Sequence, residues 1–457
     1  MSTGDPAVSR TAYWTAAAVL SGVLVAALPF AAGVIKEETG AADPAPRETA
    51  AQREYDRIGY FPRWAAYQRE FHVKNLVTSG AVGNLTTIQY AFAEPDPKGR
   101  CSVTSKGGSG PSAHDDYVRA YKAEDSVDGV ADEADDALRG HFGQLRRLKE
   151  RYPDLKINLA MGGWTGSKYF SNGALTAASR KAMVESCLDL FIRGNLPETG
   201  GAGGEGAAAG LFDGIDIDWE WPGSPGYNDN VHRPEDKRNL TLLLAEFRRQ
   251  LDAQGEKDGR RYGLSMFLPA APSDIKNLEV AKIHEYLDYG SLQGYDLHGQ
   301  WEERTGHQSN LYDAADDPGT PGKFSVDASL SDYLDAGWPA AKMNLGIPMY
   351  GRGWKGVPGR NKGLWQAGTG PAKGAHEEGL EDYKVLARRE GTVHRDEEAG
   401  AVWKYDGDTW WSYDDPELVR TKAAYIKKRK LRGGMFWSLD GDDDKASLSA
   451  ALFKALS

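Results

Sequence analysis

Eight short apolar stretches recur along this chain, and most of them are separated by segments with helical hydrophobic spacing. A strand followed by a helix, repeated eight times, is the pattern of a (β/α)8 TIM barrel, in which parallel strands form an inner ring. A doubly wound α/β sheet is the competing arrangement. The expected strands are RIGYF, TTIQYAFA (86–93), KINLAMGGW (156–164), LFDGIDIDWEW (211–221), YGLSMFL (262–268), YGSLQGYDL (289–297), MNLGIPMYG (343–351) and GGMFWSL (433–439).

The segment after the seventh expected strand does not show this alternation of strands and helices. It contains AVWKYDGDTWWSYDD, in which Asp406 and Gly407 separate two strand-like stretches. Asp-Gly at such a place is a strong hairpin signal. We therefore expect a small α+β insertion domain at 354–420, and a catalytic barrel formed by 55–353 and 421–457.

The N-terminal residues are typical of a targeting segment followed by a linker. No charged residue occurs from Thr11 to Ile35, a run long enough to cross a bilayer, and Arg10 precedes it. Residues 1–35 are therefore expected to be a signal peptide or an uncleaved N-terminal anchor. Residues 36–54, rich in Ala, Pro and charge, are expected to be a linker. In either case the rest of the chain is expected outside the cytoplasm, secreted or anchored and facing outward.

The charge and the motif content disfavour several classes of function. The formal net charge is −11, whereas nucleic-acid-binding proteins usually carry a basic face. The stretch 201–206 fits G-x-G-x-x-G, but it precedes a strand instead of following one, so we expect a loop there. The sequence contains neither H-E-x-x-H nor a Walker motif, and we expect no metal and no cofactor. Cys101 and Cys187 are not a Cys-x-x-Cys pair, and the sequence leaves open whether they form a disulfide.

The fourth expected strand contains the residues best suited to catalysis. Alternate side chains of a strand point to opposite faces, so Ile215, Ile217 and Trp219 share one face and three carboxylates share the other. These carboxylates are Asp216, Asp218 and Glu220. In a barrel they would face the lumen, where a charge is costly unless it is paired or protonated. Glu220 falls at the carboxyl end of the strand, where active sites of such barrels lie.

The crowding of these carboxylates indicates how they would work. Neighbouring like charges raise one another's pKa, so we expect the three groups to share a proton. Such sharing can keep Glu220 protonated near neutral pH, as a general acid requires. Two alternatives remain at this point: a surface strand whose carboxylates face water, and a Mg²⁺ or Mn²⁺ site built from them.

Several motifs of the chain resemble those of one enzyme family. Asp213-Gly-Ile-Asp216-Ile-Asp218-Trp-Glu220 resembles the D-x-x-D-x-D-x-E motif of glycoside hydrolase family 18, the retaining chitinases. From about Arg57 onward, RIGYF, AMGGW, GYDLHGQW, IPMYGRGW and GGMFWSLDGDD are similar to the first, third, sixth, seventh and eighth strands of that family. The 354–420 segment resembles the insertion domain of its bacterial members.

The resemblance implies catalytic roles for four residues. Glu220 would be the general acid and base, and Asp218 would orient the acetamido group of the substrate. Asp216 would hold Asp218 through a shared proton, and Tyr295 would hydrogen-bond the acetamido oxygen. Asp213 lies an odd number of residues from these three carboxylates, so its side chain would point to the other face of the strand. It is more typical of a structural polar group.

The resemblance also implies residues that bind the substrate. Asp296 would position the sugar with Arg352 as its charge partner, and Trp437 would form the floor under the cleaved sugar. His298 would be a wall or hydrogen-bonding residue. The chain has 13 Trp and 21 Tyr, which suit sugar binding or core filling. Stacking candidates, each of which could belong to the core or the rim instead, are Tyr60, Phe92, Trp164, Trp221, Trp301 and Trp365.

The chain departs from the family pattern at two places. Ala160 stands where the third strand usually has Ser, so a hydroxyl that could support the carboxylates is missing. Gln293 and Gly294 replace the common Met-Thr beside Tyr295. Both changes concern details of the sugar-binding positions and leave the acid and the Tyr-Asp pair in place.

The expected function is that of a secreted chitinase, acting as a monomer on chitin or chito-oligosaccharides. The alternatives are an endo-β-N-acetylglucosaminidase of the same family and, less favoured because Glu220 is present, a chitin-binding lectin. The resemblance implies substrate-assisted retaining catalysis. The geometry agrees, because Asp218 and Glu220 lie on one face of one strand, whereas a standard retaining pair flanks the scissile bond.

Overall fold

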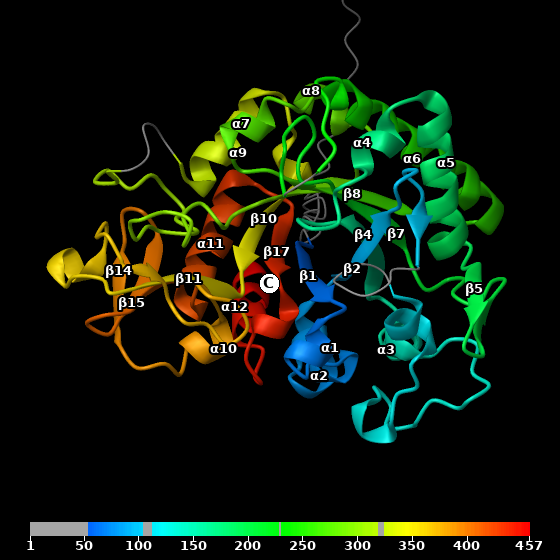
Figure 1. Cartoon of the computed structure of the whole chain (residues 1–457), viewed down its shortest axis with the longest axis horizontal. Helices are drawn as coiled ribbons and strands as arrows, with labels where there is room; N and C mark the ends of the chain where they lie inside the picture. The colour runs from blue at the N-terminus through cyan, green and yellow to red at the C-terminus, as the bar shows by residue number, and fades with distance from the viewer. Residues whose placement is uncertain (1–53, 104–111, 228–229, 319–323) are drawn as a thin grey trace, which may run out of the picture. The chain divides into compact units, whose positions relative to one another are not determined.

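A closed ring of eight parallel strands forms the centre of the computed structural model, which describes residues 54–103, 112–227, 230–318 and 324–457 (Figure 1). The strands follow the order β1-β17-β10-β9-β8-β7-β4-β2, and pairing of β1 with β2 closes the ring. The predicted (β/α)8 barrel is therefore confirmed, and the doubly wound alternative is wrong. The strands are β1 (Asp56–Pro62), β2 (Thr87–Pro95), β4 (Lys156–Gly162), β7 (Gly214–Asp218), β8 (Gly263–Leu268), β9 (Tyr289–Leu292), β10 (Met343–Pro348) and β17 (Gly433–Trp437).

Helices pack outside this ring. Figure 1 shows α4, α5 and α6 beside one another on the side of β4, β7 and β8, where they also contact one another. The helices of the barrel are α1 (Ala65–Gln68), α2 (Val73–Thr78), α3 (Gly140–Arg151), α4 (Phe170–Ala174), α5 (Ala177–Cys187), α6 (Asp236–Asp258), α7 (Pro272–Ile275), α8 (Val280–Ile283), α9 (Val326–Asp335), α11 (Pro416–Arg429) and α12 (Ser447–Leu456).

The two faces of β7 have the orientation that its alternating pattern predicts. Ile215 and Ile217 are fully buried in the large core that includes apolar residues of the helices. Trp219 stacks on Phe170 of α4, with ring centroids 5.3 Å apart. Because successive side chains alternate, this packing directs the carboxylates of the strand into the barrel.

A second, antiparallel sheet lies between β10 and α11 in the sequence. An insertion is predicted there, because the alternation of expected strands and helices is interrupted. Its order is β12-β11-β16-β15-β14, with β13 paired to β11, and the Asp406-Gly407 hairpin joins β15 to β16. The boundaries 354–420 of the insertion domain stay a prediction. The elements are β11 (Tyr350–Lys355), β12 (Gly370–Pro371), β13 (Leu380–Asp382), α10 (Tyr383–Leu386), β14 (Thr392–Asp396), β15 (Ala401–Tyr405) and β16 (Trp410–Ser412).

The structure shows the state of the two cysteines and the conformation of the glycine-rich stretch. Cys101, in the short strand β3 (Cys101–Ser102) that pairs antiparallel with the end of β2, forms a disulfide with Cys187 at the end of α5. The glycine-rich stretch lies in a hairpin of β5 (Leu196–Thr199) with β6 (Ala202–Gly204), so it does not open a helix. The predicted targeting segment, 1–35, lies outside the described residues. Within the described ranges, no helix has the length and apolar character needed to cross a membrane.

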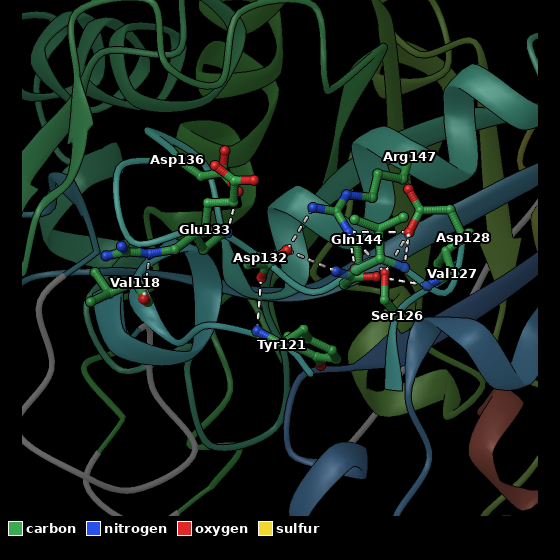
Figure 2. Close-up of polar contacts among 12 residues, drawn as sticks. Val118, Tyr121, Ser126, Val127, Asp128, Asp132, Glu133, Asp136, Gln144 and Arg147 are labelled. Atoms are coloured by element: carbon green, nitrogen blue, oxygen red, sulfur yellow. Dashed lines mark hydrogen bonds and ion pairs between the residues drawn. The ribbon is translucent and has the colours of Figure 1, made fainter. Parts of the chain in front are cut away.

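The loop before α3 contains two carboxylates that are held by one cation. Figure 2 shows Arg147 of α3 between Asp128 and Asp132, with N–O distances of 3.2 and 2.8 Å. Asp128 also accepts a hydrogen bond from Ser126 (2.7 Å), and Asp132 accepts one from the backbone N–H of Tyr121 (2.8 Å). We call Asp128, Asp132 and Arg147 the loop cluster.

Candidate active site

The innermost carboxylate of the barrel is that of Asp216, which is fully buried. Its Oδ2 accepts a hydrogen bond from Tyr60 (2.6 Å) and its Oδ1 accepts one from Ser265 (2.5 Å). The register explains this, because Asp216 lies beside Ala160 of β4 and Ser265 of β8. Burial raises the pKa of Asp216 to about 6, and the two hydrogen bonds limit this rise. Ser265 thus supplies a hydroxyl that Ala160 lacks.

Asp218 and Glu220 form a hydrogen-bonded pair at the end of the same strand. Burial, followed by the charges of Glu220 and Asp216, raises the pKa of Asp218 well above its usual value. Burial, followed by the charge of Asp296, raises the pKa of Glu220 to about 8. One proton is therefore retained by this pair near neutral pH. Asp218 hydrogen-bonds Glu220, and the proton shared by Asp216 and Asp218 that the resemblance implies stays a prediction.

The backbone of Glu220 is fixed by two residues that the sequence analysis missed. Its N–H donates to Oγ of Ser167 (2.9 Å), and its carbonyl oxygen accepts from Nδ2 of Asn230 (3.1 Å). The Ser167 hydroxyl is in turn 2.9 Å from the carbonyl oxygen of Gly163 and 3.1 Å from that of Asp218. These contacts tie the loop after β4 to the end of β7.

Tyr295 and Asp296 follow β9, near the same end of the barrel. Burial raises the pKa of Tyr295 well above its usual value, so its hydroxyl stays protonated and can donate a hydrogen bond. Oδ1 of Asp296 accepts hydrogen bonds from Tyr350 (2.6 Å) and from Nε of Arg352 (2.7 Å). The Arg352 guanidinium lies over the ring of Trp301, 5.2 Å from its centroid. Arg352 is thus the charge partner of Asp296.

A cavity of about 630 Å³ brings most of the predicted residues together. Trp437 lines it, stacked on Phe92 with ring centroids 5.7 Å apart. Trp164 and Trp301 lie at its rim, 48% and 58% exposed, and Asp216 lies beneath the lining. The other predicted lining residues are Tyr60, Asp218, Glu220, Trp221, Tyr295, Asp296 and Arg352. Lining residues that the sequence analysis missed include Trp64, Phe267, Asp274, Gln300, Tyr350 and Glu377.

Besides Asp216, two further candidates lie outside the cavity lining. Trp365 packs in a core of the antiparallel sheet and its neighbouring loops, formed mainly by Trp354, Trp403 and Trp410. His298 is buried between two carboxylates, with Nδ1 2.8 Å from Glu302 and Nε2 3.4 Å from Asp317. Both side chains therefore support the loops around the cavity.

Asp213, the first residue of the acidic motif, lies at the opposite end of β7 from Glu220. It forms an ion pair with Lys149 (2.7 Å) and another with Arg260, and it accepts the backbone N–H of Ile157 (2.9 Å). The burial of Asp216 and Asp218 contradicts the alternative of a solvent-facing strand. Across the described residues, no group of His, Cys, Asp and Glu has an arrangement that could hold a metal ion.

Comparison with known proteins places this geometry in a family. Residues 56–442 match the model for glycosyl hydrolases family 18. Chitinase A1 of Niallia circulans is 36% identical over 432 residues, which cover 88% of this chain and 58% of the relative. Chitinase C of Streptomyces lividans is 35% identical over 424 residues, covering 90% and 61%. The chain thus spans about three fifths of the length of these curated relatives.

A solved structure agrees with this assignment. The catalytic domain of psychrophilic chitinase B from Arthrobacter TAD20 superposes with a TM-score of 0.85 at 44% identity, covering 88% of this chain and 95% of that one. The match of the family model, the identities to the curated relatives and the shared fold lead to one conclusion: the chain belongs to glycosyl hydrolases family 18.

Proposed function

We propose that this protein is a chitinase that hydrolyses β-1,4 bonds between N-acetylglucosamine units. The observation that carries the proposal is the hydrogen-bonded pair of Asp218 and Glu220, which holds a proton at an aromatic-lined cavity. A general acid needs such a proton at neutral pH, and aromatic faces suit the C–H faces of sugars. The relatives named chitinases support the same substrate class.

In the proposed mechanism, Glu220 protonates the oxygen of the leaving sugar. The oxygen of the substrate's own acetamido group attacks the anomeric carbon, which gives an oxazolinium-like intermediate. Asp218 orients the amide N–H and offsets its positive charge, and Tyr295 holds the carbonyl end. Water then opens the ring with Glu220 as base, so the anomeric configuration is retained. The position of Asp218 and Glu220 on one strand face supports this route, because neither carboxylate faces the other across the bond.

Substrate positioning is proposed for the residues around the pair. The charge of Asp216 raises the pKa of Asp218 and so helps to keep a proton on the pair, and Trp437 forms the floor under the cleaved sugar. The Asp296 and Arg352 pair holds that sugar's polar edge. Further stacking positions are Tyr60, Phe92, Trp164, Trp221 and Trp301. Glu377 and Leu380, from the antiparallel sheet or its loops, also line the cavity, which supports a long polysaccharide more than a short glycan.

We also propose that the enzyme works outside the cytoplasm as a monomer. The uncharged run from Thr11 to Ile35 supports export, and the disulfide between Cys101 and Cys187 suits an oxidising compartment. N-terminal sequencing of protein recovered from culture fluid and from membranes tests this. Full-length protein confined to the cytosol would contradict export.

Substrate-assisted catalysis has a strict requirement that can be tested. The sugar on the non-reducing side of the cut must carry an N-acetyl group, so cleavage of partly acetylated chitosan should give only acetylated new reducing ends. Mass spectrometry identifies those ends, and NMR of products from N-acetylglucosamine hexamer identifies the first anomer. Abundant glucosamine reducing ends, or an inverted first product, would overturn the mechanism.

A further inference from the structure

Asp274 is a cavity-lining carboxylate that belongs to none of the motifs described above. It lies in α7, the short helix that follows β8, and it is half-buried. Ser224, in the loop after β7, donates a hydrogen bond to it. Burial raises the pKa of Asp274 from its ordinary value, and this hydrogen bond opposes the rise. The carboxylate thus lines the cavity from α7, which follows β8, the strand next to β7.

The negative charges of Asp274 and Asp296 differ in whether a cation is paired with them. Asp296 is paired with Arg352 at 2.7 Å. In the described part of the chain, no ion pair within 4.0 Å joins Asp274 to a cation, and Lys276, which acts on it electrostatically, is exposed. The charge of Asp274 also contributes to the raised pKa of Glu220. A negative charge is thus left inside the cavity, close enough to the acid to affect it.

The order of the strands indicates which sugar this charge would meet. β17, which ends in Trp437, lies four strands from β7 in either direction around the ring, so the proposed sugar floor is opposite Glu220. β4 and β8 flank β7, and their following loops carry Trp164 and Asp274. A leaving group that extends from a sugar seated over Trp437 past Glu220 would reach these two loops.

We propose that Asp274 binds the ammonium group of a glucosamine unit in the leaving group, so that the enzyme favours partly deacetylated chitin at that position. This inference rests on the proposed chitinase function. An ammonium brought beside an unmatched, half-buried carboxylate gains an ion pair that the neutral acetamido group cannot form. The two sides of the cut then have opposite preferences: an N-acetyl group where the acetamido attacks, and a free amine where the sugar departs.

The test is to identify the sugars on the departing side of the cut. Wild type, Asp274→Asn and Asp135→Asn are incubated with a partly acetylated chitosan, and tandem mass spectrometry gives the ratio of glucosamine to N-acetylglucosamine at new non-reducing ends. Asp135 is exposed and lies in the loop before α3, so its change removes the same charge away from the cavity. The ratio is independent of overall rate, and calorimetric titration with a fully deacetylated hexamer measures the ionic contact without turnover.

The expected results separate this inference from the proposed function. Asp274→Asn should lower the glucosamine ratio by about two- to fivefold, and the affinity for the deacetylated hexamer by a similar factor, the range that a part-exposed ion pair supplies. Asp135→Asn should match wild type in both. Equal ratios and equal affinities in wild type and Asp274→Asn would overturn the role of Asp274 while leaving the chitinase proposal intact. Wild type that cleaves no acetylated oligomer would instead overturn the proposed function, and the titration would still decide the role of Asp274.

Discussion

Two groups of carboxylates in this molecule differ mainly in whether a cation lies among them. In the loop cluster, Arg147 contacts both Asp128 and Asp132. Burial would raise the pKa of Asp128, but the hydrogen bonds of Ser126 and of the Val130 N–H, together with Arg147, lower it overall. The loop cluster therefore keeps a charge at Asp128 and serves to hold a loop against α3.

The carboxylates of β7 are surrounded by hydroxyl groups and by one another. Tyr60 and Ser265 donate to Asp216, and Asp218 and Glu220 hydrogen-bond each other. Because hydroxyl and carboxyl groups surround these carboxylates in place of a cation, burial raises their pKa values. The pair of Asp218 and Glu220 therefore keeps a proton near neutral pH. A counter-charge alone does not decide the outcome, because burial raises the pKa of Asp132 even beside Arg147. What distinguishes the carboxylates of β7 is that like charges add to the effect of burial, and that Asp218 and Glu220 line the cavity.

The largest expected effect comes from removing the proposed proton donor, Glu220. Glu220→Gln keeps the size and polarity of the side chain but cannot donate and recover a proton. We expect kcat on N-acetylglucosamine hexamer to fall by at least about 10²–10⁴-fold. Binding of the hexamer, measured by calorimetry, should survive. Near-normal turnover in the pure variant would mean that Glu220 is not the acid.

Replacing the partner of the acid should also be severe. Asp218→Asn removes the charge that would stabilise the acetamido group and changes the hydrogen bond to Glu220. We expect kcat to fall by about 10²-fold or more, which is the loss seen when one general acid or base, or one group that stabilises charge, is removed. Steady-state kinetics on the hexamer check this, with Asp128→Asn in the loop cluster as the matched control. A fall of similar size in that control would remove the distinction between the two groups.

The pH dependence of wild-type activity tests the pKa values of the carboxylates of β7. As the proposed general acid, Glu220 would have to be protonated to act, and its raised pKa of about 8 predicts that kcat/KM falls as the pH rises above that value. A single essential proton gives about a tenfold loss per pH unit there. On the acid side, protonation of Asp216, with its pKa of about 6, should reduce activity below that pH. An activity that stays flat up to pH values well above 8 would contradict the assignment of the acid.

The smallest effect on catalysis is expected from the loop cluster. Arg147→Met leaves Asp128 and Asp132 without their shared cation, and the side chain of Asp132 is fully buried. We expect a loss of about 1–3 kcal/mol in the free energy of unfolding, since Arg147 and Asp128 are partly exposed. Denaturant unfolding measures this loss, and kcat of the folded variant should stay at the wild-type value. A stable variant with reduced kcat would instead link this loop to the site.

The sequence predicted the features that depend on local patterns. The barrel follows from eight recurring apolar runs, and the inward direction of Asp216 follows from strand alternation. Ser265 was missed because its contact with Asp216 depends on the lateral register of β7 and β8, which a single sequence does not reveal. Asp274 was missed because loops place it, and no motif accompanies it. For Trp365 the sequence left open whether the side chain stacks on a sugar or packs in a core, because an exposed and a packed tryptophan look the same in sequence.

The disulfide has a consequence for the unfolded chain. It joins two residues separated by 86 positions, and the closed loop contains the loop cluster, β4 and Trp164. In the chain-entropy account, closing a loop of this size removes freedom from the denatured ensemble and stabilises the fold by about 4–5 kcal/mol. Neither cysteine lines the cavity. Reduction should therefore lower the melting temperature while the folded enzyme retains its rate, so that the heat tolerance of this protein depends on the redox potential of its surroundings.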